Sequence, residues 1–175
     1  MLKGKGVVVP AVERGQRMDK KTDFYTFRGY HLRNTRRQEN LTPSMEDYLE
    51  MIYRLSKDSG HTRVLELATA LNVQPPSASN MIQRLAERNW LVYEKYSIVR
   101  LTEKGRERGA YLLNRHRILE EFLLFLGLED VLEDTEKIEH NISPAAVTGL
   151  ERLLAFFDSN PDILAKWQTF YRGQV

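Results

Sequence analysis

Apolar side chains recur at intervals of three and four residues in several stretches after residue 40, a pattern typical of helices that bury one face. The first stretch predicts a helix over about residues 43–55, with Thr42 as its N-cap and Pro43 in its first turn. A short helix is predicted over residues 64–71, and a third helix begins at Pro75 after a turn. In the short helix, the positions expected to face inward are Leu65, Ala68 and Leu71.

The pattern changes after the third helix. Residues 91–102 are rich in β-branched and aromatic side chains, and they are few enough to fold back as a two-stranded ribbon. Helix, short helix, turn, helix and ribbon follow one another in this order in a winged helix-turn-helix, whose third helix enters the major groove of DNA. The residues of this helix expected to approach bases or phosphates are Pro76, Ser77, Ser79, Asn80, Gln83 and Arg84. The wing candidates are Lys95, Tyr96 and Arg100.

Helical spacing continues through the rest of the chain. It predicts a long helix over residues 103–126 that ends at Gly127, followed by helices over residues 129–141, 144–158 and 161–171. The expected fold class is therefore mainly α, with an N-terminal winged helix-turn-helix that carries a two-stranded β wing and an all-helical domain after it. A small domain with a polar helix face need not bind DNA, so this pattern alone leaves the function open.

Composition and charge narrow the picture. The 175 residues include no cysteine, which removes disulfides, thiolate metal sites and cysteine nucleophiles. No apolar run is long enough to span a bilayer and no signal-peptide core is present, so we expect a cytoplasmic protein. Residues 1–40 carry ten Lys or Arg against four Asp or Glu. We interpret them as a basic flexible extension, followed by a DNA-binding domain over residues 41–110 and a helical domain over residues 111–175.

Six oxygen and nitrogen donors form a candidate metal site. Asp47 and Glu50 lie three residues apart on the first helix, where exposed acidic pairs also commonly complement the helix dipole. Glu136, Glu139 and His140 follow the i, i+3, i+4 pattern and share one side of a later helix. The sixth donor is His116, in a basic stretch of the long helix. Each has an ordinary surface explanation by itself, so the interpretation depends on three helices bringing them together.

Charge decides what such a cluster would hold. Four carboxylates and two neutral imidazoles in one pocket would carry a charge of about −4, which is prohibitive unless cations enter. Two divalent ions neutralise it, so the residues favour a two-metal site over a single ion. Oxygen-rich ligation without sulfur suits Mn²⁺, with Fe²⁺, Cd²⁺ or Zn²⁺ as possible substitutes.

The chain from about residue 42 to residue 157 resembles the manganese transport regulators of the diphtheria-toxin-repressor superfamily. The resemblance is carried by the segments Thr42–Glu50, Tyr93–Tyr96, Leu101–Gly105, Arg115–His116 and Ile138–His140. It implies two metal ions bound between the winged domain and a dimerisation domain, with the six donors above as ligands. Iron-responsive relatives have methionine where Asp47 stands, so the resemblance favours manganese over iron. The extension over residues 1–40 and the tail over residues 159–175 lie outside it.

The function implied is a manganese-responsive DNA-binding transcription regulator, expected to repress metal-uptake genes, and not an enzyme. Its expected partners are double-stranded operator DNA and a second copy of the chain, with no membrane or small organic substrate. Dimerisation is expected through the long helix and the 144–158 helix, at Leu119, Phe122, Leu123 and Leu150. The alternatives are an iron-responsive regulator of the same superfamily, a metal-independent winged-helix regulator, and a two-metal carboxylate enzyme, although a ferritin-like enzyme site would need a second Glu-x-x-His copy.

Overall fold

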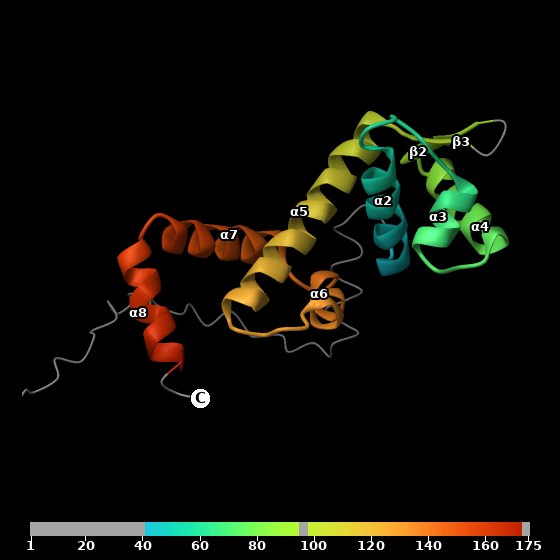
Figure 1. The fold of residues 1–175 in the computed structure, drawn as a ribbon. Coiled ribbons are helices and arrows are strands. Elements are labelled where there is room, and N and C mark those ends of the chain that lie inside the picture. The colour runs from blue at the N-terminus through green and yellow to red at the C-terminus, as the bar shows by residue number, and fades with distance from the viewer. Residues whose placement is uncertain (1–40, 95–97, 173–175) are drawn as a thin grey trace, which may run out of the picture.

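The computed structural model describes residues 41–94 and 98–172, which form seven helices and three short strands. Figure 1 shows two groups of elements joined by one long helix, α5 (Glu103–Phe125). At one end lie the elements of residues 43–101, and α2 (Pro43–Ser56) lies alongside the first part of α5. At the other end, α6 (Leu132–Glu139), α7 (Pro144–Asp158) and α8 (Pro161–Arg172) follow α5. The mainly α fold expected from the sequence is confirmed.

The winged domain forms because its local signals agree with its packing. The Thr42 hydroxyl caps α2 by accepting from the backbone N–H of Met45 at 3.3 Å, with Pro43 in the first turn. Two further helices follow, α3 (Val64–Ala70) and α4 (Pro75–Glu87). Between them Asn72 takes a left-handed backbone with φ of 52°, which closes the tight turn. The predicted helix-turn-helix is therefore present.

The inward stripe predicted for α3 is wrong at Leu65. Its side chain is 66% exposed, and Val64 and Leu67 face the core in its place, whereas Ala68 is buried as predicted. The preceding strand β1 (Thr62–Arg63) fixes where the helix starts, and Glu66 accepts from the backbone N–H of Arg63 at 3.0 Å. The helix starts at Val64 as predicted, so only the choice of its buried face differs from the prediction.

The wing has three strands, whereas the sequence predicted two. Strands β2 (Leu91–Tyr93) and β3 (Ile98–Leu101) form the expected antiparallel hairpin, with Leu91 opposite Leu101. The short β1 pairs with the other edge of β3, which gives the order β1-β3-β2. A two-residue strand leaves no periodic signal in a sequence, and here it exists because the chain before α3 meets the free edge of β3.

One hydrophobic core holds the winged domain together and extends onto α5. Fully buried members come from α2, α3, α4, the strands and α5, namely Leu49, Ile52, Leu67, Ile82, Leu85, Val99 and Leu112. Two glycines let α5 pack closely against its neighbours. A Cβ at Gly105 would lie 1.8 Å from the Trp90 carbonyl oxygen, and a Cβ at Gly109 would lie 2.6 Å from the Cβ of Tyr53. Helix α5 thus packs closely against Trp90 and against α2, and the contact with α2 positions the residues described below.

The long helix runs without a break through residue 110, where the sequence analysis placed a domain boundary. Thr102 caps its start by accepting from the Gly105 N–H at 3.1 Å, and Gly127, with φ of 85°, follows its end as predicted. The next helix, α6, is shorter than the predicted 129–141 segment. None of the helices in residues 41–94 and 98–172 is long and apolar enough to cross a membrane.

The four residues predicted for dimerisation occupy different environments. Leu119 and Leu123 are buried within the chain itself, whereas Phe122 and Leu150 are half-buried. The helices from α5 onward carry several exposed apolar side chains, namely Leu124, Leu153, Phe156, Ile163 and Phe170. Dimerisation through α5 and α7 stays a prediction, with Phe122 and Leu150 as the members that are still accessible.

Candidate metal centre

All six donors predicted from the sequence come together where α2, α5 and α6 meet. Ligand atoms of Asp47, Glu136, Glu139 and His140 lie within 4.8 Å of one another, and those of Glu50, His116 and Glu139 form a second group within the same limit. Glu139 belongs to both groups. Two adjoining groups that share one carboxylate match the arrangement expected of a two-metal site with a bridging ligand.

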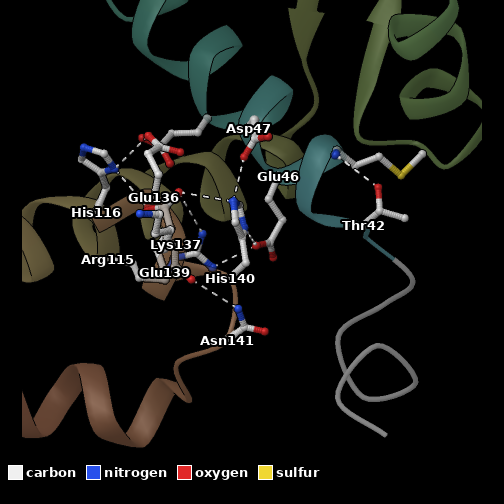
Figure 2. Close-up of polar contacts among 12 residues, drawn as sticks. Thr42, Glu46, Asp47, Arg115, His116, Glu136, Lys137, Glu139, His140 and Asn141 are labelled. Atoms are coloured by element: carbon white, nitrogen blue, oxygen red, sulfur yellow. Dashed lines mark hydrogen bonds and ion pairs between the residues drawn. The ribbon is translucent and has the colours of Figure 1, made fainter. Parts of the chain in front are cut away.

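Helices α2, α5 and α6 each supply part of the set of six donors. Helix α2 contributes Asp47 and Glu50, whose i, i+3 spacing places both on one face, and α5 contributes His116. The rest come from α6 and its C-cap residue, His140. In Figure 2, Asp47 points from α2 toward His140, while His116 points toward Glu136 and Glu139. The centre therefore bridges the winged domain and the helices after it.

His140 is held by a carboxylate on each side of its ring. Its Nε2 lies 3.0 Å from Asp47 Oδ1, and its Nδ1 lies 3.0 Å from Glu46 Oε2. Burial disfavours the charged imidazolium, but the hydrogen bonds to Asp47 and Glu46 outweigh it and raise the pKa of His140 to about 9. Without metal, this histidine is therefore protonated at neutral pH.

Glu46 is a buried acidic residue of the centre that the sequence analysis missed. Besides His140, it accepts from Arg115 Nη1 at 2.9 Å and from Arg108 Nη2. Burial would raise the pKa of this carboxyl, but the hydrogen bond from His140 and the charge of Arg115 lower it to about 2. Its neighbour Asp47 was recognised as a candidate ligand. Glu46 is distinguished by its ion pair with the buried Arg115, and a sequence does not show which side chains pair.

His116 faces the second group of donors. Its Nδ1 lies 3.0 Å from Glu139 Oε2 and 3.9 Å from Glu136 Oε1. The hydrogen bond with Glu139 is the main cause that raises the pKa of His116, and the positive charge of the nearby Arg54 acts in the opposite direction. Burial, followed by the charge of Glu139, raises the pKa of the Glu136 carboxyl. Both shifts favour the protonated form of these groups and reflect the crowding of carboxylates around them.

The donor set suits a hard or borderline divalent cation. Glu139 is only 2% exposed, and Glu50 is also buried, so the cluster places negative charge where water cannot screen it well. A pocket of about 330 Å³ opens onto Asp47, Glu50, His116, Glu136 and Glu139. Carboxylate oxygens and imidazole nitrogens without sulfur are the ligands preferred by such ions. These residues fit the metal ions that the sequence analysis expected.

Metal binding at this centre should weaken as the pH falls. A metal ion must displace the proton that His140 carries below its pKa of about 9, and a proton from His116 as well when that ring is charged. Between pH 8 and pH 7, we expect the affinity for Mn²⁺ to fall about tenfold for each proton displaced. Calorimetric titration in buffers of different ionisation enthalpy counts these protons. An affinity that stays constant across this range would contradict the assignment of the histidines.

The face of α4 carries the residues predicted to contact DNA. Pro76, Ser77, Asn80, Gln83 and Arg84 are exposed, whereas Ser79 is half-buried. On the wing, Arg100 is exposed and pairs with Glu94 at 3.3 Å, and Lys95 and Tyr96 lie outside the described residues. A polar helix face with a single cation near its end can approach a major groove closely. The DNA contacts themselves stay predictions.

Comparison with known proteins identifies both halves of the chain. Residues 40–99 match the iron dependent repressor N-terminal DNA binding domain, and residues 102–168 match the iron dependent repressor metal binding and dimerisation domain. The HTH-type transcriptional regulator MntR of Lysinibacillus sphaericus is 42% identical over 127 residues, which cover 71% of this chain and 91% of that protein. MntR of Geobacillus kaustophilus is 44% identical over 121 residues, covering 68% and 86%.

Solved structures agree with this result. The manganese regulator SloR superposes with a TM-score of 0.58 at 30% identity, over 66% of this chain and 55% of that one. The metal-dependent transcriptional regulator MtsR superposes with a TM-score of 0.60 at 31% identity, with the same coverage. The chain therefore spans about half the length of these solved regulators, although it covers most of the MntR proteins. The chain belongs to the iron dependent repressor family, whose members are metal-dependent DNA-binding transcription regulators and not enzymes.

Proposed function

We propose that the chain is a manganese-responsive regulator that binds operator DNA in the cytoplasm as a homodimer and represses metal-uptake genes. Two Mn²⁺ ions per chain would bind at the six donors. The observation that carries this proposal is the sharing of Glu139 between two donor groups, one completed by Asp47 and the other by Glu50. Because both of these residues lie on the first helix of the winged domain, a metal ion at either group would join that domain to α6.

The choice of manganese rests on the donors and on the relatives. The six donors are carboxylates and imidazoles, and Asp47 offers a hard oxygen where the resemblance implies methionine in iron-responsive relatives. Relatives named as manganese regulators match the chain, and one solved relative is described as a manganese-dependent repressor in complex with manganese. Zn²⁺ and Cd²⁺ are bound in structures of the related ScaR, which supports both ions as substitutes here. Fe²⁺ is the remaining substitute we expect.

The coupling between metal binding and DNA binding follows from the charges at the centre. Without metal, the carboxylates of α2 and α6 repel each other, and protonated histidines together with nearby arginines offset only part of this repulsion. A bound divalent ion would hold Asp47 and Glu50 against Glu139, and this would fix the position of α4 relative to a second copy of the chain. Two recognition helices held about 34 Å apart would match successive major grooves of DNA. A coupling free energy of about 1–3 kcal/mol is enough for such a switch.

The experiment for this proposal compares DNA binding with and without metal. Fluorescence anisotropy with labelled DNA from the promoter of the chain's own gene or of a neighbouring transporter gene is measured in Mn²⁺ and in chelator. We expect an affinity about 5-fold to 150-fold higher with Mn²⁺, which corresponds to a coupling free energy of about 1–3 kcal/mol. Equal binding in both conditions would favour a winged-helix protein that ignores metal.

Replacing Asp47 by methionine should change which metal activates the protein. A thioether is a softer ligand than a carboxylate, so we expect the Asp47→Met variant to lose about tenfold or more in affinity for Mn²⁺ and to shift its preference toward Fe²⁺. Anaerobic titration of each metal against DNA binding measures both effects. An unaltered metal response would show that Asp47 does not coordinate the metal.

A further inference from the structure

A cation of the protein itself already occupies one of the carboxylates of the metal centre. Arg54 donates from Nε to Glu50 Oε1 at 2.9 Å and from Nη2 to the same oxygen. Arg54 follows Glu50 by one helical turn on α2, so the two side chains lie on the same face of this helix and can pair there. The two side chains line the same pocket, together with His116 and Glu139.

Two features distinguish this pair from an ordinary surface ion pair. The Glu50 side chain is only 8% exposed, whereas the Arg54 side chain is 37% exposed, so the carboxylate is fixed and the guanidinium reaches in from the rim. Glu50 is also one of only three members of its donor group, with His116 and Glu139. The charge of Arg54 also acts on His116, in the direction that opposes its protonation. The guanidinium therefore lies within electrostatic reach of two of the three donors.

We propose that Arg54 is an internal counter-ion that competes with the metal ion for Glu50 and so sets the metal concentration at which the protein responds. This inference rests on the proposed metal centre and adds a residue whose positive charge opposes metal binding there. A guanidinium stays charged at all accessible pH values, so it cannot make way by losing a proton as the histidines can. A divalent ion at this group must therefore take Glu50 from Arg54 or bind beside a fixed positive charge, and both lower its affinity.

The same geometry explains how the competition can be reversible. The Arg54 side chain is 37% exposed, so its head can turn into water while its stem stays in place and the core is not broken. Glu50 itself stays buried and in place for the metal. Removal of Arg54 should strengthen binding mainly at the group of Glu50, His116 and Glu139. The cations near the other group, which contains Asp47 and His140, are Arg108 and Arg115, and both pair with Glu46. The Mn²⁺ affinity of that group should therefore change less.

Calorimetric titration of the full chain with MnCl₂ tests the proposal on four proteins. Arg54→Met keeps the aliphatic stem and removes the charge, and we expect about tenfold tighter Mn²⁺ binding, equivalent to about 1.4 kcal/mol. Arg54→Lys keeps the charge and should stay within about threefold of the unchanged protein. Lys57→Met is the matched control, because Lys57 is another cation of this region but lines a different pocket, and it should leave the affinity unchanged.

The outcomes separate this inference from the proposed function. If the unchanged protein binds no Mn²⁺, the metal centre itself fails. If it binds Mn²⁺ and Arg54→Met binds with the same or lower affinity, Arg54 does not compete and the inference is overturned. An equal gain in Lys57→Met would also overturn it, since any lost positive charge would then have the same effect. The midpoint of Mn²⁺-dependent DNA binding should shift to lower concentration in Arg54→Met by the same factor.

Discussion

The Glu139→Ala variant is expected to lose its metal response completely. Glu139 is the one residue of the described chain that joins both donor groups, and it is almost fully buried between His116 and Arg115. Substitution of a residue that only supports a ligand commonly lowers metal affinity by about 10-fold to 100-fold, so loss of a shared ligand should lower it by at least about 100-fold. Calorimetry with Mn²⁺ and anisotropy with promoter DNA should both show this loss.

Glu133→Ala is the matched control for that variant. Glu133 lies on the same helix, but it is exposed, pairs with Lys137 and belongs to neither donor group. Its Mn²⁺ affinity should remain within about twofold of the unchanged protein, since a surface ion pair contributes little. If Glu139→Ala retains manganese-dependent DNA binding, Glu139 is not a ligand and the two groups do not share a bridge.

The Gly105→Ala variant is expected to be strongly destabilised. A Cβ at this position would lie 1.8 Å from the Trp90 carbonyl oxygen and 3.0 Å from its carbonyl carbon, and a backbone cannot move aside as a flexible side chain can. Overpacking in a core costs typically about 1–3 kcal/mol and occasionally more, and we expect a loss of about 3 kcal/mol here. Urea denaturation followed by circular dichroism gives the free energy of unfolding.

Gly149→Ala provides the comparison, because Gly149 also lies inside a helix but a Cβ at this position would meet no neighbouring atom within 4 Å. Alanine is a better helix former than glycine, so this variant should be as stable as the unchanged protein or more stable by up to about 1 kcal/mol. A Gly105→Ala protein that unfolds at the same urea concentration as the unchanged protein would show that α5 does not pack against Trp90 as closely as described.

The helices could be predicted from the sequence because their signals are local. Thr42 and Thr102 cap α2 and α5 as expected, and Gly127 follows the end of α5. The third strand and the orientation of Leu65 could not be predicted, since both depend on where β1 meets β3 in space. Local periodicity specifies that a helix forms, and tertiary contacts decide which of its faces is buried.

The helical spacing of the carboxylates and imidazoles suggested a shared face, and the resemblance to the manganese regulators implied that all six act as one ligand set. The sequence did not indicate the cations around them. Arg115 and Arg54 look like ordinary surface residues of a charged helix, yet one is buried beside Glu46 and the other holds Glu50. Pairing across helices depends on packing, and for this reason Glu46 was not distinguished from other acidic residues of the first turn.

The number of Mn²⁺ ions that the full chain binds at pH 7.5 can be measured by electron paramagnetic resonance of the free ion during titration. We expect two ions per chain, with promoter affinity rising over the same range of Mn²⁺ concentration. Fewer than one ion per chain, or two ions bound without any change in promoter affinity, would contradict the claim that these six donors couple metal to DNA binding.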